Sequence, residues 1–293
     1  MESISEVMAQ LQERAMKMSL QRQSETERPG AVEYECDECK DKEIVFSHVD
    51  EKGYEIYKPC QCRERKAWRR RFKNAFIPEE FTKANLDNYK QNTSVQKSMY
   101  QLTEEYLARF PGSPKELKDM NNFGLIANIG EQRIRSMPDA DRTNAKTKHN
   151  NFGVGKTHFQ IALSKQLIKR GFNVLVISDV TFTDEMMNAR RMNDGNETFN
   201  GLMNGVLSAD VLMWDDIGKA RPTEAKEALY YNIINERYKK QKPIVFNSNE
   251  DRGTLAERIG YAASSRLIGN CYDAEAKKDY LLEVEGEDWR LKK

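Results

Sequence analysis

The sequence predicts an α/β domain with a mostly parallel sheet, preceded by a small cysteine-bearing module and an N-terminal helix. Strand and helix patterns alternate from about residue 76 onward, which is typical of that fold class. The stretch GVGKTH at 153–158 has the glycines and the lysine of a phosphate-binding loop. Four cysteines between positions 36 and 62 form two close pairs, as in small zinc modules. We therefore expect two regions, residues 1–75 and 76–293, with the boundary near the helix-breaking Pro78.

Composition excludes some classes of protein. The 47 lysine and arginine residues nearly balance the 46 aspartate and glutamate residues, so net charge does not indicate a nucleic-acid partner. No apolar run approaches the roughly 18–20 residues that cross a bilayer. The first residues, MESISEVMAQLQ, have neither a basic leader nor an apolar signal core. We expect a cytoplasmic protein, in which the five cysteines bind metal or stay as buried thiols rather than forming disulfides.

Two helical stretches are expected in the N-terminal region. Within residues 1–25, apolar side chains recur at the spacing of one helical face, at Ile4, Val7, Met8, Leu11, Ala15 and Met18. This helix either binds a partner or packs on its own chain. The second stretch, RERKAWRRRFK at 63–73, is strongly basic and includes Trp68 and Phe72. Its cations and aromatic rings could contact nucleic acid through phosphate attraction and base stacking. A charged linker helix is an equally good interpretation.

The cysteine module spans about residues 32–62. Cys36-x₂-Cys39 and Cys60-x-Cys62 supply four thiolates, the number with which zinc completes a tetrahedral structural site. The strand-like stretches EIVFSHV and YEIYKP lie between the pairs and predict a hairpin that brings them together. A module of this size has too little apolar surface to fold without metal. His48 could replace one cysteine as a ligand, and the alternative for the whole cluster is four thiols without metal. Cys271 lies far from these pairs in the sequence and is expected to be a structural thiol.

The elements of the α/β domain follow in order. We expect strands at 123–130, 172–178, 209–216 and 243–249, and helices at 156–171 and 223–241. The first helix begins at the glycine-rich stretch and is closed by Gly171. The third strand ends in Asp215 and Asp216.

The glycine-rich stretch predicts a nucleotide site. Gly153, Val154 and Gly155 let backbone N–H groups converge on phosphate oxygens, to which the following helix also presents its N-terminus. Lys156 would reach the β- and γ-phosphates, and the Thr157 hydroxyl would hold Mg²⁺. We include His158, the next residue, among the candidates for cofactor binding. Asp215 fits the metal role, and Asp216 could orient or deprotonate an attacking water.

One feature of this loop departs from the usual pattern. Asn150 occupies the position where G-x-x-x-x-G-K-[ST] has its first glycine, and the residues just before it are polar rather than strand-like. We expect the missing strand at 123–130, with Gly130 or Asn128 near the usual first position. Residues from about 130 to 150 would then be an insertion, which loops out if its ends lie close. Asn150 tolerates a left-handed backbone less well than glycine, so nucleotide binding is either kept or weakened.

Several stretches together resemble a known family: NFGVGKTHFQIAL, VLMWDDIG, PIVFNSN, ERIGYAASSRLIG and the terminal EGEDWRLKK. In this order they are similar to the bacterial and phage replicative helicase loaders of the DnaC/DnaI kind, AAA+ ATPases of the initiator clade. The resemblance extends from the cysteine module to the C-terminus. It implies an AAA+ P-loop domain of three layers with a mostly parallel sheet, and a nucleotide site that binds ATP with Mg²⁺.

The same resemblance implies roles for residues outside the loop. Asn249 matches a polar sensor that positions the hydrolytic water, and Arg266 matches an arginine finger that reaches a neighbouring subunit's nucleotide. Arg258 is a second candidate for the finger, and Arg290 matches a second sensor less closely. Each arginine has an alternative as a solvated surface residue.

The resemblance leads to a functional expectation. An ATPase whose turnover is weak or DNA-modulated would bind the replicative hexameric helicase through residues 1–75 and self-associate through its AAA+ domain. It would help place the helicase on single-stranded DNA during replication initiation. A phage or prophage origin is plausible. Two alternatives are a transposition-accessory ATPase of the IstB-like kind, which generally lacks such a zinc module, and a helicase-binding adaptor that does not hydrolyse ATP.

Overall fold

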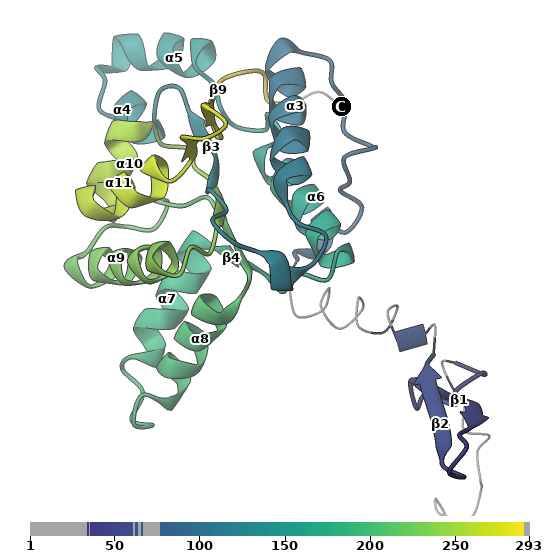
Figure 1. Cartoon of the computed structure of the whole chain (residues 1–293). Coiled ribbons are helices and arrows are strands. Elements are labelled where there is room, and N and C mark those ends of the chain that lie inside the picture. Colours follow the sequence, from purple (N-terminus) through teal and green to yellow (C-terminus); the bar gives the residue numbers. More distant parts are fainter. Residues whose placement is uncertain (1–33, 35, 61, 64–65, 67–76, 290–293) are drawn as a thin grey trace, which may run out of the picture. The chain divides into compact units, whose positions relative to one another are not determined.

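The computed structural model describes residues 34, 36–60, 62–63, 66 and 77–289 (Figure 1). The helix expected within 1–25, Arg290 and most of the basic stretch 63–73, including Trp68 and Phe72, lie outside the described residues. By their internal contacts the residues divide into two units, Met1–Arg65 and Lys66–Lys293. Among the described helices, none combines the length and the apolar character needed to span a membrane.

The first unit contains the predicted hairpin. Strand β1 (Ile44–Val49) pairs in antiparallel fashion with β2 (Glu55–Pro59), from Ile44 opposite Pro59 to Val49 opposite Glu55. The Asp50 carboxylate accepts hydrogen bonds from the backbone N–H groups of Lys52 and Tyr54, at 2.9 and 2.8 Å, and so closes the turn. The hairpin expected between the two cysteine pairs is confirmed.

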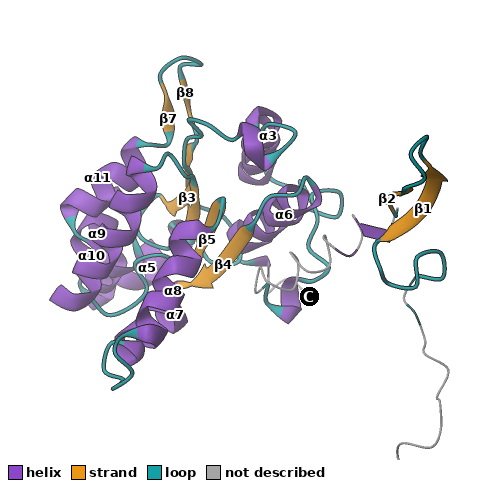
Figure 2. Cartoon of the chain, turned by 60° about the horizontal axis from the view of Figure 1, so that its bottom comes forward, coloured by secondary structure: helices purple, strands orange, loops and turns teal. Residues whose placement is uncertain are grey.

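The second unit has a five-stranded parallel sheet in the order β4-β5-β6-β3-β9. Its strands are β3 (Phe123–Ala127), β4 (Val174–Ser178), β5 (Val211–Asp215), β6 (Ile244–Asn247) and β9 (Leu281–Val284). The first four lie within the stretches that the sequence predicted, whereas β9 had no predicted counterpart. A small antiparallel pair, β7 (Tyr272–Asp273) and β8 (Lys278–Asp279), precedes β9 and projects beyond the sheet (Figure 2).

Helices cover both faces of this sheet, giving three layers (Figure 1). One face packs against α3 (Ser94–Arg109) and α6 (Lys156–Lys169). The other packs against α7 (Asp179–Ala189), α8 (Glu197–Ser208), α9 (Glu224–Lys239), α10 (Arg252–Ile259) and α11 (Tyr261–Gly269). Alternate side chains of a strand enter the two cores: Val211 and Met213 of β5 face the first, Leu212 and Trp214 the second. The α/β class with a mostly parallel sheet is thus confirmed.

Residues 131–148, which the sequence analysis placed in an insertion, form two short helices between β3 and α6. These are α4 (Glu131–Arg135) and α5 (Asp139–Lys148), and no residue of α5 is buried. Two 3₁₀ turns, Glu79–Phe81 and Pro114–Glu116, complete the unit. Because all five strands are parallel, the residues that follow β3, β5 and β6 meet at one edge of the sheet.

Candidate functional site

The phosphate loop lies between α5 and α6 and depends on its glycines. Gly153 has a φ of 65° and Gly155 a φ of 104°, backbone conformations that side chains disfavour. A Cβ on Gly153 would overlap the carboxylate of Asp288, and one on Gly155 would strike the ring of Tyr89. The Tyr89 hydroxyl also donates to the Val154 carbonyl at 2.9 Å. The loop is therefore held from outside while its inner side borders a cavity.

That cavity has a volume of about 320 Å³ and collects residues from the loop before α6 and from the ends of β5 and β6. Its lining comprises Phe81, the loop and first helical turn (residues 151–158), Asp216, Lys219 and Asn249. Lys156 is buried there, and its Nζ donates to the backbone oxygen of Asn151 at 2.9 Å and to Asn249 Oδ1 at 2.7 Å. The predicted loop residues, Asp216 and Asn249 thus line one cavity.

Thr157 and Asp215 form the candidate metal position beside it. The Thr157 hydroxyl donates to Asp215 Oδ1 at 3.0 Å, and the amide of Asn247 donates to the same oxygen at 2.6 Å. Burial raises the pKa of Asp215, the Asn247 hydrogen bond opposes this, and the charge of Asp216 adds to it. A hydroxyl and a carboxylate oxygen are ligands that Mg²⁺ prefers, so the donor set fits this ion.

Asn249 connects the loop lysine with the second acid. Its Oδ1 accepts from Lys156, and its Nδ2 donates to Asp216 Oδ1 at 2.8 Å. Asp216 has a left-handed backbone, with a φ of 54°, and its N–H donates to Asn247 Oδ1 at 3.0 Å. Asp216 and Asn249, which were both predicted to act on the hydrolytic water, are therefore in direct contact.

The break in the loop motif also has a structural account. Asn150 has no positive φ, so a glycine is not required at its position. Its amide donates instead to the carbonyls of Phe152 and Gly286, at 2.9 and 2.6 Å. The concern that Asn150 would have to adopt a left-handed backbone was therefore wrong.

The two ends of the segment 131–150 are neighbours in space. The Asn151 amide lies 3.5 Å from the Ile129 carbonyl, and a Cβ on Gly130 would overlap Thr254, Asp251 and Glu250. Gly130 joined directly to Asn151 would give GNFGVGKT, an uninterrupted G-x-x-x-x-G-K-T motif. We therefore assign Gly130 as the first glycine of the loop and 131–150 as the intervening segment.

The remaining candidates make other contacts within the chain. His158 lines the cavity, but its Nε2 is 2.9 Å from the Asn85 carbonyl oxygen, so this nitrogen is used within the chain. Arg258 donates to the carbonyls of Gly218, Lys219 and Ala220 and so fixes the turn after Asp216. Arg266 lies on α11, outside the cavity, with its guanidinium 5.2 Å from the centre of the Tyr231 ring. Its role as a finger stays a prediction.

Three side chains of the site were not predicted from the sequence. Asn247 donates to both Asp215 and Gln160, at 2.6 and 2.7 Å, and so orients the metal carboxylate. Asp179 is fully buried and accepts from Trp214, Tyr230 and the Ala220 N–H. The signal available for both was a polar residue within or just after an apolar strand. Tyr89 gave no signal, because it meets the loop from far upstream.

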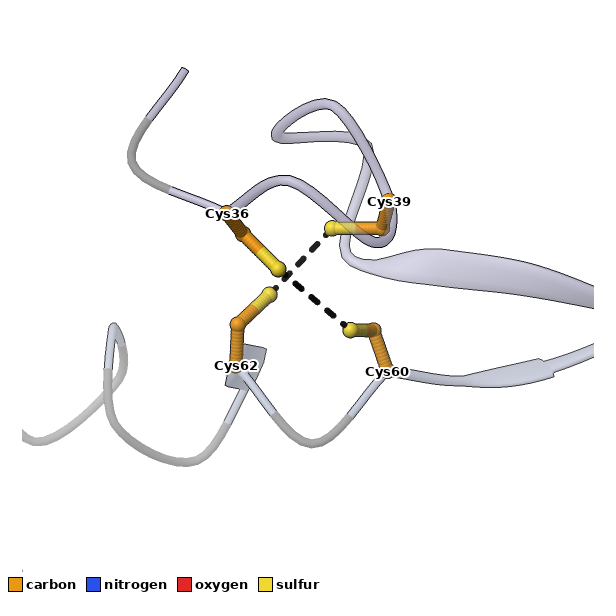
Figure 3. A group of neighbouring side chains, drawn as sticks. All are labelled: Cys36, Cys39, Cys60 and Cys62. Atoms are coloured by element: carbon orange, nitrogen blue, oxygen red, sulfur yellow. Dashed lines mark hydrogen bonds between the residues drawn. The ribbon is translucent and has the colours of Figure 1, made fainter.

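The four predicted cysteines gather at the base of the hairpin (Figure 3). All four sulfur atoms lie within 4.8 Å of one another, with Cys36 3.8 Å from Cys60 and Cys39 3.3 Å from Cys62. Ligands at about 2.3 Å around a tetrahedral zinc ion imply sulfur separations in this range. His48 is exposed, contacts Ser47 and is not part of the group. The donor set and spacing therefore fit zinc.

Comparisons with known proteins agree with this architecture. Residues 81–293 match the family model described as IstB-like ATP binding protein. The phage-like element PBSX protein XkdC of Bacillus subtilis (strain 168) is 24% identical over 270 residues, which cover 89% of this chain and 86% of XkdC. The replicative helicase loader DnaI of the same organism is 24% identical over 181 residues, 61% of this chain and 56% of DnaI.

A solved structure of the DnaC helicase loader is similar in fold, with a TM-score of 0.51 at 19% identity. The match covers 71% of this chain and 100% of that one. At such identity the likeness establishes the AAA+ P-loop fold and not an activity. The matched region spans little more than half of DnaI. The family model, however, covers most of the chain. The protein therefore belongs to the family of IstB-like ATP-binding proteins.

Proposed function

We propose that this protein is an ATP-dependent loader of the replicative hexameric DNA helicase. The observation that carries the proposal is the convergence of Lys156, the Thr157–Asp215 pair and the Asp216–Asn249 pair on one cavity edge. That set supplies what phosphoryl transfer needs: a cradle, a cation site and a base beside an amide. Similarity to DnaI and DnaC supports the choice of helicase as partner.

The chain's own residues suggest how hydrolysis proceeds. The N–H groups of residues 153–157 and Lys156 bind the phosphates, and Thr157 and Asp215 hold Mg²⁺, which when bound neutralises charge on the β- and γ-phosphates. Asp216 takes a proton from the attacking water, which Asn249 orients with it. Arg266 acts on the nucleotide of a neighbouring subunit, and Arg290 is proposed to sense the nucleotide within its own chain.

The N-terminal region would provide the grip on the helicase. Cys36, Cys39, Cys60 and Cys62 hold Zn²⁺ and keep the hairpin in shape, and residues 1–75 present the binding surface. The AAA+ domain, residues 76–293, self-associates, and the assembly contacts single-stranded DNA transiently. Hydrolysis then resets the complex after the helicase has been placed.

Two other functions have an observation in their favour. The family model favours a transposition-accessory ATPase, although the cysteine cluster lies outside the matched residues 81–293 and is not a general feature of such proteins. The interrupted phosphate loop favours an adaptor that binds the helicase without hydrolysing ATP.

Two measurements distinguish these functions. ATP turnover with and without single-stranded DNA should be abolished in Lys156→Ala and kept in Lys169→Ala, a control on the exposed side of the same helix. Absence of turnover in the parent protein would favour the adaptor. Co-purification with a hexameric replicative helicase should be lost when residues 1–62 are deleted, and failure of the full chain to bind a helicase would reject the loader.

A further inference from the structure

A second lysine lines the phosphate cavity. Lys219 borders it together with Lys156, Asp216 and Asn249. It follows Asp216 by three positions in a tight turn, in which the Lys219 N–H donates to the Asp216 carbonyl at 3.0 Å. The turn places an amine on the side of the cavity where Asp216 and Asn249 lie. Because the proposed base Asp216 would act on the water that attacks the γ-phosphate, a nucleotide bound here would present its terminal phosphate to this side.

Hydrogen bonds hold the backbone of Lys219 in place, whereas its side chain is partly exposed. Arg258 donates to the Lys219 carbonyl at 3.2 Å and to the Ala220 carbonyl at 3.0 Å. The Ala220 N–H donates to the buried Asp179 at 2.8 Å. The Lys219 side chain remains 40% exposed. A partly exposed amine therefore extends from a backbone that is held in place by hydrogen bonds.

In this structure the partner of Lys219 is Glu131, the first residue of the segment 131–150. Lys219 Nζ lies 3.0 Å from Glu131 Oε2, and only 12% of the Glu131 side chain is exposed. The Glu131 N–H donates to the Asn249 carbonyl at 2.9 Å, which ties the residue to the cavity edge. Burial raises the pKa of Glu131, but Lys219 and Arg135 outweigh it, so the pKa falls below its usual value and the carboxylate is ionised.

We propose that Lys219 is a contact for the terminal phosphate of ATP, and that Glu131 is the carboxylate from which this phosphate takes it. A terminal phosphate carries more negative charge than a carboxylate, so it would compete with Glu131 for the amine. A diphosphate ends short of the Asp216 side and leaves the Lys219–Glu131 pair intact. The segment 131–150 would thus respond to whether the site holds a triphosphate. The inference depends on the proposed function only in requiring that the site bind ATP.

Affinities for a non-hydrolysable ATP analogue and for ADP, each with Mg²⁺, test this by calorimetric titration. Lys219→Ala should weaken binding of the triphosphate about tenfold and of ADP less than about twofold, because a charge-assisted hydrogen bond is lost only in the triphosphate complex. Glu131→Gln should strengthen binding of the triphosphate several-fold by removing the competitor. Lys226→Ala, which breaks the pair of Lys226 on α9 with Asp184 on α7 at 2.8 Å, should change neither affinity.

Three outcomes would overturn the inference: equal losses for both nucleotides in Lys219→Ala, no loss for either, or weaker triphosphate binding in Glu131→Gln. Lys219→Gln provides the same comparison if the alanine variant does not fold, as judged by thermal unfolding. A parent protein that binds neither nucleotide would reject the proposed function together with the inference. A parent that binds both, with an affinity ratio unchanged in the Lys219 variants, would reject the inference alone.

Discussion

At the scale of single residues, one amide organises the acidic end of β5. Asn247 donates to the Asp215 carboxylate and accepts from the Asp216 N–H, so it fixes the proposed metal ligand and the proposed base relative to each other. It also supports the left-handed backbone of Asp216, which turns that side chain toward Asn249. The site's geometry therefore depends on a neutral side chain of the neighbouring strand as much as on the acids themselves.

The raised pKa of Asp215 predicts a pH dependence. Mg²⁺ needs the ionised carboxylate, which burial disfavours. Without the ion, the contribution of this group to stability is fully present below its unfolded pKa and is lost as pH rises through its raised folded pKa. Mg²⁺ bound with nucleotide should offset that loss, so the rise in thermal midpoint that Mg²⁺ adds to ADP should be larger at neutral than at mildly acidic pH. Asp215→Asn should abolish the difference, and a rise independent of pH in the parent protein would contradict this assignment.

At the scale of elements, the segment 131–150 interrupts a loop without separating its parts. Its flanking residues meet where the Asn151 side chain lies 3.5 Å from the Ile129 carbonyl, and the α5 helix has no buried residue. It is nevertheless attached to the C-terminal region, through His149 with Glu285 and through Asn150 with Gly286. The segment is thus an addition whose first helix, α4, packs on the domain through the buried Ile134 and the Arg133–Asp251 pair.

Deletion of 131–150, with Gly130 joined to Asn151, should give a folded protein that still binds nucleotide. The deletion removes α5, which has no buried residue, together with the buried Ile134 and the Arg133–Asp251 pair of α4, and it restores the continuous motif. Nucleotide affinity and a cooperative thermal transition are the measurements. The same deletion carrying Lys156→Ala should not bind and serves as the control. Loss of binding in the deletion alone would mean that the segment forms part of the site.

At the scale of the whole molecule, the chemistry is divided between the two units. Every residue of the phosphate cavity lies in the second unit, and the four clustered thiols lie in the first. The first unit has a core that consists mainly of its cysteines, with Val45 packed against them. Its fold should therefore depend on metal, while the nucleotide site should not.

Metal analysis of the purified full chain should find one zinc ion per molecule, as four cysteine ligands imply. Removing it with a chelator should unfold the hairpin unit and leave affinity for nucleotide unchanged. Cys36→Ser together with Cys39→Ser should reproduce both effects, whereas Cys271→Ser, which alters a buried thiol of the other unit, should retain the zinc. A full chain that contains no zinc, or that loses nucleotide affinity on chelation, would contradict this division.

The sequence by itself determined the local features, which are four strands of the sheet, the helix that follows GVGKT, and the hairpin between the cysteine pairs. These depend on side-chain periodicity and on glycine conformation, which neighbouring residues encode. The tertiary structure alone decided that β9 completes the sheet, that Ile129 meets Asn151, and that Lys219 pairs with Glu131. Those contacts join residues far apart in the chain, because strand order brings loops to a common edge, and no local pattern specifies strand order.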